Sequence, residues 1–328
     1  MHILQTLKLR ATAIGGNIVL PEATDERTLR AAAMMIQEKL ARVTLLGDPQ
    51  SIQKDAATLQ LDLAGCTMID PANSPDTARF ADIFFEKRKE KGITKEQALA
   101  TMQNVLFYGA MMVREGLASG MVAGAANTTA DVLRAALQVV GVMPGLKTVS
   151  SSFIMVSPRE NEKTYLFADC AVVPNPTDEQ LADIASSTAR TRRSILGDEP
   201  YVALLSFSTK GSADHELVEK VRSARNILDA RKVDFAYDGE LQLDAAIVEK
   251  VAKSKAPGSN VAGRANTLVF PDLQAGNIGY KLVQRLGGYE AIGPIIQGLA
   301  APICDLSRGC STEDIFNTAI LVLLMSKK

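Results

Sequence analysis

The sequence predicts an α/β protein built from two units. Strand-like and helix-like segments alternate along most of its 328 residues, and this alternation favours parallel sheets covered by helices. The apolar content of 47% can form more than one core, and the chain exceeds the usual domain length of about 100–200 residues. We therefore expect two α/β domains.

The first unit begins with a βαβ pattern. A short apolar run, the polar turn that follows it and an amphipathic helix lead into the apolar run 42–46, and the whole pattern covers residues 17–49. This order favours a right-handed crossover between parallel strands. A mobile connection is expected at 54–65, and a third strand at 66–70.

The rest of the first unit repeats the change from strand to helix. A helix is expected over 94–118, with Gly109 and Gly116 as interruptions or ends. A strand and a second helix follow in residues 120–141.

The pattern changes after residues 141–148. Two apolar runs, 150–158 and 163–173, flank a charged turn, which indicates adjacent strands joined as a hairpin. A second α/β series follows, with a mobile connection at 254–265. Its expected elements are helix 177–196, strand 201–208, helix 214–231, strand 234–242, strand 266–272 and helix 277–286.

The last segment is one strand-like piece, 291–307, followed by a helix with apolar residues on nearly every face. Such a helix has to be buried. If it packs onto the first unit, that unit is discontinuous. We therefore assign residues 1–146 and 300–328 to domain I and residues 147–299 to domain II.

Composition excludes several classes of function. The 36 basic and 37 acidic residues leave no broad positive field for nucleic acid, and the chain has no tryptophan to stack on bases. No segment offers about 20 apolar residues without charge, so no membrane span is expected. The first residues lack the apolar core of a secretory signal, and we expect a cytoplasmic protein.

The four cysteines and two histidines do not form a metal-binding pattern. No CxxC pair occurs among the cysteines, and neither histidine lies close to them in sequence; the four are Cys66, Cys170, Cys304 and Cys310. We therefore expect no metal site and no disulfide framework.

The segment DLSRGCSTEDI, residues 305–315, is the strongest candidate site. Ser311 and Asp314 have the spacing of a helix cap, which explains two of its residues. Ser307 and Arg308 follow the end of an expected strand, where open α/β sheets bind ligands. Ser307 can donate to an oxyanion, Arg308 can bind phosphate through two parallel hydrogen bonds, and Asp314 can act as a general base.

Two further segments could bind anions. Asn127, Thr128 and Thr129 lie between a strand and a helix N-terminus, which could form a phosphate cradle. The simpler interpretation is that these residues cap the helix. The basic run 87–91 is typical of a solvated helix face, and a phosphate patch is the alternative.

Four stretches of the sequence, including DLSRGCSTEDI and VAGAANTTADVLRAALQ, resemble phosphate acetyltransferases. The other two are FADCAVVPNPTDEQLADIA and GRANTLVFPDLQAGNIGYKLVQRL, and the resemblance extends over essentially the whole chain. It implies reversible acetyl transfer between acetyl phosphate and coenzyme A. It also implies two α/β domains of the isocitrate/isopropylmalate dehydrogenase-like kind, an interdomain cleft and a homodimer.

Five residues match the family's functional positions. The resemblance implies that Ser307, Arg308 and Asp314 are catalytic, and that Arg88 and Arg134 bind coenzyme A. Coenzyme A is then a substrate and not a bound cofactor, and acetyl phosphate and phosphate are the other small-molecule partners. We expect direct attack of the thiolate on acetyl phosphate in a ternary complex.

Several alternatives stay open at this stage. A phosphate butyryltransferase would share the fold and layout, and a module that senses acetyl-coenzyme A without turnover would share the binding residues. A metal- and nicotinamide-dependent dehydrogenase would need clustered acidic ligands, which the sequence lacks. An acylated Ser307 is disfavoured because no histidine lies nearby in sequence to serve as its base.

Overall fold

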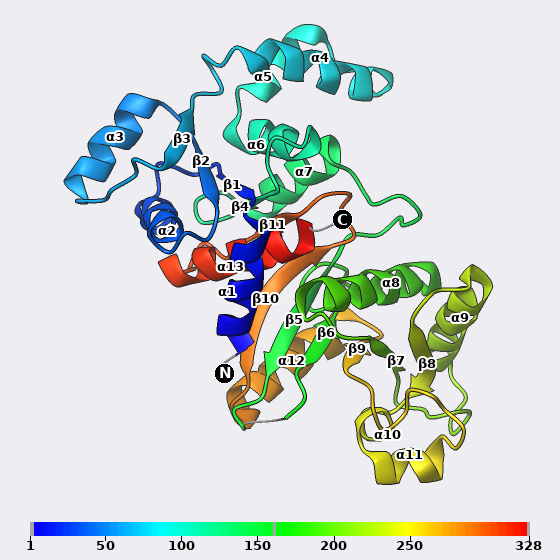
Figure 1. The fold of residues 1–328 in the computed structure, drawn as a ribbon. Coiled ribbons are helices and arrows are strands. Elements are labelled where there is room, and N and C mark those ends of the chain that lie inside the picture. The colour runs from blue at the N-terminus through cyan, green and yellow to red at the C-terminus, as the bar shows by residue number, and fades with distance from the viewer. Residues whose placement is uncertain (1–2, 160–161, 327–328) are drawn as a thin grey trace. The chain divides into compact units, whose positions relative to one another are not determined.

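The computed structural model in Figure 1 describes residues 3–159 and 162–326. The chain divides into two compact units, one formed by Met1–Gly141 with Leu299–Lys328 and the other by Val142–Gly298. Each unit has its own sheet and its own helices. The prediction of two α/β domains is therefore confirmed. The interdomain cleft stays a prediction.

The first unit contains a five-stranded parallel sheet in the order β11-β4-β1-β2-β3. Its strands are β1 (Asn17–Leu20), β2 (Arg42–Leu46), β3 (Cys66–Ile69), β4 (Gly120–Ala123) and β11 (Ile303–Asp305). Its helices are α1 (Ile3–Ile14), α2 (Glu26–Gln37), α3 (Pro49–Thr58), α4 (Asp76–Arg88), α5 (Lys95–Met102), α6 (Val105–Arg114), α7 (Thr129–Val139) and α13 (Thr312–Ser326), with the short 3₁₀ helix η1 (Lys89–Lys91) after α4.

Two expectations for this unit were wrong. The expected mobile connection at 54–65 is partly helical, because Asp48 caps α3 through the N–H groups of Gln50 and Ser51 and Pro49 occupies its first position. The single helix expected over 94–118 is two helices. The break is at Asn104, whose side chain caps α6, and Gly109 lies inside α6.

Helix α13 is largely buried from Ile315 to Leu324, as its apolar sequence predicts. It packs against α1, α2 and β4 of the same unit. Gly120 at the start of β4 permits this approach, because a Cβ atom there would overlap the Val322 side chain of α13. The C-terminal helix therefore completes the core of the first unit.

The second unit contains a mixed sheet in the order β10-β5-β6-β9-β7-β8. The β5–β6 pair is antiparallel, as expected for the hairpin-like connection. The β10–β5 pair is antiparallel too, and the other pairs are parallel. Its strands are β5 (Ser150–Val156), β6 (Tyr165–Ala168), β7 (Tyr201–Leu205), β8 (Ala236–Leu241), β9 (Thr267–Val269) and β10 (Glu290–Gln297). Its helices are α8 (Asp178–Ile195), α9 (Glu216–Arg231), α10 (Leu243–Ile247), α11 (Glu249–Lys255) and α12 (Leu273–Gly287).

The expected single strand at 291–307 is two strands that belong to different sheets. Strand β10 pairs with β5 in the second unit, and β11 pairs with β4 in the first. Residues 298–302 connect the two strands. This division places Ser307 and Arg308 on the first unit.

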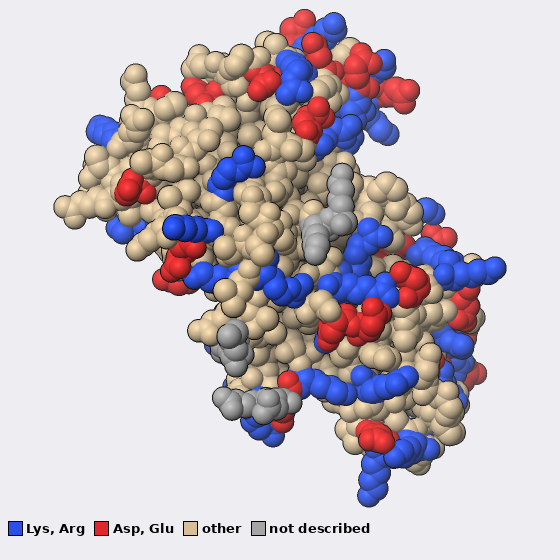
Figure 2. Space-filling view, in the orientation of Figure 1, with Lys and Arg blue, Asp and Glu red and all other residues tan. Residues whose placement is uncertain are grey.

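The charges on the visible surface are mixed. In Figure 2, basic and acidic side chains are interspersed over the face shown. None of the helices in residues 3–159 and 162–326 is long and apolar enough to cross a membrane.

Candidate functional site

Three loops meet at one edge of the first unit's sheet. Strands β11, β4 and β1 are parallel neighbours, so their carboxyl ends share that edge. The loops that follow them contain residues 21–25, 124–128 and 306–311. The chain continues from β1 to β2 on one side, whereas β4 and β11 lie on the other. Such a switch in strand order is where open α/β sheets bind ligands.

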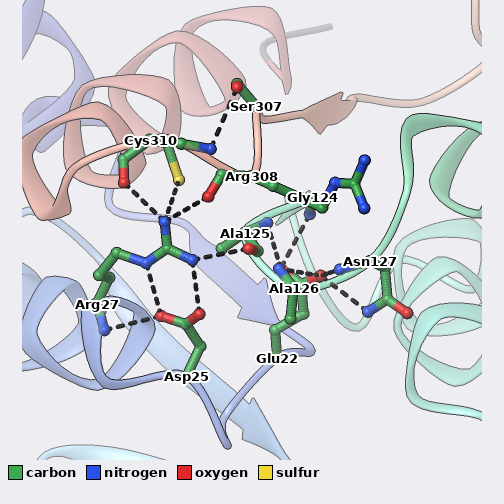
Figure 3. Close-up of polar contacts among 11 residues, drawn as sticks. Glu22, Asp25, Arg27, Gly124, Ala125, Ala126, Asn127, Ser307, Arg308 and Cys310 are labelled. Atoms are coloured by element: carbon green, nitrogen blue, oxygen red, sulfur yellow. Dashed lines mark hydrogen bonds and ion pairs between the residues drawn. The ribbon is translucent and has the colours of Figure 1, made fainter.

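Glu22 fills an anion cradle within this edge (Figure 3). Its carboxylate accepts hydrogen bonds from the N–H groups of Gly124, Ala125, Ala126 and Asn127 at 2.7–3.1 Å, and from Asn127 Nδ2 at 2.8 Å. Glu22 is 4% exposed. Consecutive N–H groups that converge in this way bind anions. Here the anion is a side chain of the same unit.

Arg27 connects all three loops. Its guanidinium donates to the carbonyl oxygens of Arg308 at 2.8 Å, Cys310 at 2.9 Å and Ala125 at 2.7 Å. It also pairs with both carboxylate oxygens of Asp25, a contact that lowers the Asp25 pKa. These bonds use the planar fork of arginine, which a lysine cannot reproduce. Arg27 therefore sets the path of the loop that contains Ser307 and Arg308.

Asp305 is a buried acid at the end of β11. It is 4% exposed, its Oδ2 accepts from Thr129 Oγ1 at 2.6 Å, and its Oδ1 is buried with no hydrogen-bond partner among the described residues. Burial, with a smaller contribution from the charge of Glu22, raises the pKa of Asp305 to about 6. Gly124 permits the close approach, because a Cβ atom there would lie 2.5 Å from Asp305 Oδ1.

Ser307 and Arg308 are exposed on the loop after β11. Ser307 Oγ accepts from the Gly309 N–H at 3.2 Å, so its own proton remains free for another acceptor. The Arg308 side chain points away from Arg27 in Figure 3. Within residues 3–159 and 162–326 its guanidinium makes no hydrogen bond or ion pair. An unpaired arginine at this edge is suited to an anionic ligand.

Asp314 caps helix α13, as its spacing from Ser311 predicts. Its Oδ2 accepts from the Ser311 N–H at 2.8 Å, and its own N–H donates to Ser311 Oγ at 3.1 Å. The side chain is exposed. The structure therefore brings Asp314 to the helix start that follows Ser307 and Arg308. Its role as a base stays a prediction.

The three residues predicted to form a phosphate cradle use their side chains within the protein. Asn127 donates to Glu22, Thr128 caps α7 through the Asp131 N–H, and Thr129 donates to Asp305. The expected cap at Thr128 is confirmed. These contacts give no support to phosphate binding by the three side chains, which stays untested.

The two predicted coenzyme A residues lie on other helices of the first unit. Arg88 ends α4 and makes no side-chain hydrogen bond or ion pair in the described part of the chain. Its neighbour Lys87 differs, because its ammonium donates to the carbonyl oxygens of Val139 and Val140 at 2.6 and 3.3 Å. Arg134 on α7 is half-exposed and pairs with Asp131 at 2.7 Å.

Sequence reasoning missed Glu22, Arg27 and Asp305. Glu22 and Asp305 each lie at the carboxyl end of an apolar strand, where a buried acid is unexpected unless the fold supplies donors for it. That position was the available signal. Arg27 resembled an ordinary residue of an amphipathic helix, and nothing in its local sequence indicated contacts with residues 308 and 310.

Comparison with known proteins agrees with this layout. Residues 2–323 match the family described as phosphate acetyl/butaryl transferase. A protein named phosphate acetyltransferase from Thermoanaerobacterium thermosaccharolyticum is 54% identical over 96% of both chains, and one from Treponema pallidum is 49% identical over 99% of both. The crystal structure of a phosphotransacetylase from Streptococcus pyogenes is 45% identical, covers 99% of this chain and 98% of its own, and superposes with a TM-score of 0.93.

The raised pKa of Asp305 predicts an unusual dependence of stability on pH. The unfolded carboxyl releases its proton near pH 3.8, whereas the folded one retains it until about pH 6. The folded state therefore binds more protons between these values, and its stability falls as the pH rises through them. The variant Asp305→Asn lacks this loss of stability. The free energy of unfolding of the variant minus that of the wild type should therefore increase by up to about 3 kcal/mol as the pH is raised from about 4 to about 7.

Urea unfolding at several pH values measures this difference. Asp48→Asn is the matched control, because hydrogen bonds from Ser51 lower the pKa of Asp48 below its usual 3.8, so any pH-dependent difference from the wild type is confined to more acidic pH and no rise is expected between about pH 4 and about pH 7. A difference between Asp305→Asn and the wild type that does not change with pH would show that Asp305 titrates like an exposed carboxyl group.

Proposed function

Because the chain belongs to the phosphate acetyl/butaryl transferase family, we propose that it transfers an acetyl group reversibly between acetyl phosphate and coenzyme A. The observation that carries this proposal is the near full-length identity of 49–54% to proteins named phosphate acetyltransferase. The relatives with that name favour acetyl over butyryl as the group transferred. The free guanidinium of Arg308 at the sheet edge supports an anionic substrate.

Arg308 and Ser307 are proposed to act on acetyl phosphate. A guanidinium binds two phosphate oxygens at once and offsets the negative charge that grows on the leaving phosphate. The Ser307 hydroxyl keeps its proton free, so it can donate to the oxyanion that forms at the attacked carbonyl carbon. The loss of one such donor typically raises a reaction barrier by about 2.7–4 kcal/mol.

Asp314 is proposed to accept the thiol proton. A free thiol has a pKa of about 8.5, so only a few per cent is thiolate at neutral pH and a base speeds the attack. Sulfur then bonds to the carbonyl carbon, the carbon–oxygen bond to phosphate breaks, and inorganic phosphate leaves. The bonds to Ser311 hold the Asp314 carboxylate in one orientation while leaving it exposed.

Coenzyme A is proposed to bind as a substrate through its phosphates. Among the residues that the structure describes, Arg88 has no side-chain partner to give up, and the partner of Arg134 is an exposed carboxylate that a phosphate can replace at little cost. Both arginines belong to the first unit, as do Ser307, Arg308 and Asp314.

We also propose a homodimer that pairs through α12. Ile278, Leu282 and Leu286 recur every fourth residue on this helix, and they are 57%, 51% and 82% exposed. An apolar stripe of this kind is typical of an interface between subunits.

Sedimentation of the wild type is expected to give about twice the monomer mass of 35.1 kDa, and Leu282→Glu should shift it to the monomer. A monomeric wild type excludes this assembly.

A cytoplasmic location is proposed from the cysteines. Cys66, Cys170 and Cys310 are free thiols. Free thiols are typical of reducing compartments.

Thioester absorbance tests the activity directly. The wild type mixed with acetyl phosphate and coenzyme A is expected to form acetyl-coenzyme A, whereas a sensing module would bind coenzyme A without turnover. If Asp314 is the base, Asp314→Asn should lower kcat by at least about 100-fold with little change in KM. Unchanged turnover would assign the proton to another group.

Ser311→Ala is the matched control for that variant. It removes the same helix cap from the opposite side, at a typical cost of about 1 kcal/mol in stability, but keeps the Asp314 carboxylate. If Ser311→Ala lowers kcat as much as Asp314→Asn does, the cap and not the base explains the effect.

Arg88→Ala tests the contact with coenzyme A. Loss of one charge-assisted contact should raise KM for coenzyme A by about 10-fold or more and change KM for dephospho-coenzyme A much less, because that analogue lacks the 3′-phosphate. Arg79→Ala is the control, because Arg79 lies on the same helix and pairs with Asp76. An equal effect on KM for coenzyme A and for dephospho-coenzyme A would make Arg88 structural.

A further inference from the structure

The hydroxyl of Thr129 has a fixed hydrogen-bond direction. Thr129 is exposed at the first position of α7, and its Oγ1 lies 2.6 Å from Oδ2 of the buried Asp305. A threonine hydroxyl has one proton to donate and two lone pairs that accept. An ionised carboxylate can only accept. The single proton of Thr129 therefore points toward Asp305, and the lone pairs of its oxygen remain available to solvent or a ligand.

The surroundings of Asp305 maintain the hydrogen bond from the Thr129 hydroxyl to its carboxylate. Its carboxyl group is 4% exposed, and Thr129 is the side chain that hydrogen-bonds to it. Near neutral pH the group is mostly ionised, because its pKa is raised only to about 6. The charge that acts on it is that of Glu22, from the loop after β1. On α7 the nearest ionisable group, Asp131, is paired with Arg134, and residues 124–128 of the β4 loop contain none.

We propose that Thr129 contacts coenzyme A as a hydrogen-bond acceptor, with Asp305 as the positioning residue that orients its hydroxyl. This inference rests on the proposed function for the identity of the substrates. Coenzyme A offers donors along its arm, namely amide N–H groups and the terminal thiol. Acetyl phosphate and phosphate at neutral pH present mainly acceptor oxygens. An oxygen that can only accept therefore discriminates between the two substrates, and it favours coenzyme A.

This assignment differs from a phosphate cradle at the same residues. A phosphate would need the Thr129 proton, which is already committed to Asp305. The backbone donors of 124–127 are likewise committed, in this case to Glu22. The donors of this loop that could bind an anion are thus already paired within the first unit. At Thr129 the loop offers a ligand only the lone pairs of the hydroxyl oxygen, which accept hydrogen bonds.

Calorimetric titration of the full chain with coenzyme A, and separately with inorganic phosphate, tests the proposal. Thr129→Val should raise Kd for coenzyme A by about three- to tenfold, the range expected for one hydrogen bond, and leave Kd for phosphate unchanged. Thr129→Ser keeps the hydroxyl and should restore wild-type affinity. Thr58→Val, an exposed helical threonine of the same unit whose hydroxyl bonds to the Lys54 carbonyl, should bind like the wild type.

The pH dependence of coenzyme A binding distinguishes an effect of the Thr129 hydroxyl's orientation from an effect of side-chain packing. Below about pH 6 Asp305 gains a proton, can itself donate to Thr129, and frees the threonine proton to point outward. The wild type should therefore lose more affinity for coenzyme A below about pH 6 than Thr129→Val or Asp305→Asn does. Melting temperatures of all variants verify that they are folded.

Each alternative outcome has a definite meaning. Weaker binding of phosphate by Thr129→Val, with coenzyme A unaffected, would make Thr129 a donor and overturn the proposal. Failure of Thr129→Ser to restore binding would overturn it too. If the wild type binds coenzyme A but forms no acetyl-coenzyme A, the proposed function fails while the comparison of Kd values still tests this inference. A wild type that does not bind coenzyme A overturns both.

Discussion

The segment from Glu22 to Arg27 holds the edge of the first unit's sheet together. Glu22 gathers the N–H groups of the loop after β4, and Arg27 gathers carbonyl oxygens from the loops after β4 and β11. One residue supplies negative charge to donors, and the other supplies positive charge to acceptors. Polar backbone groups that the loops after β4 and β11 would otherwise leave unpaired are therefore satisfied, which a stable fold requires.

This constraint explains why Ser307 and Arg308 can be exposed and yet held in place. A loop on a surface is normally the mobile part of a domain. Here the carbonyl oxygens of Arg308 and Cys310 are both bound by Arg27, and the N–H of Leu306 continues the ladder to Ala123. The backbone is tied at several points, while the Ser307 hydroxyl keeps its proton free and the Arg308 guanidinium makes no polar contact with the described residues. A catalytic group needs this combination, because its position must be set before the substrate arrives.

Asp305 differs from Glu22 in how well its buried charge is compensated. Its carboxyl group is buried beside the charge of Glu22, and the hydrogen bond from Thr129 to its Oδ2, with a smaller effect of the Leu306 backbone, offsets this burial in part. Glu22 is equally buried but has five donors. Two acids at the same edge therefore have different roles. Glu22 is a structural anion, whereas Asp305 is a group whose burial costs stability, and such costs are common where a residue serves a ligand.

The local pattern of residues was enough for much of the fold and for part of the site. Alternating periodicity predicted the βαβ start, the antiparallel pair β5–β6 and the burial of α13, because these depend on which faces are apolar. The capping pairs Ser311–Asp314 and Thr128–Asp131 were also readable, since both partners lie within one helical turn. Ser307, Arg308, Asp314, Arg88 and Arg134 were named through a family resemblance and not through spacing.

Contacts between distant segments could not be predicted in the same way. Glu22 meets residues 124–127 and Arg27 meets residues 308 and 310 only because β1, β4 and β11 are neighbours in the sheet. The split of residues 291–307 into two strands likewise depends on which sheet each half joins. Hydrophobic periodicity tells which face of a segment is buried, but it does not tell which other segment covers that face. The direction of the Thr129 hydroxyl follows from an acid that lies 176 residues away, and only folding brings the two together.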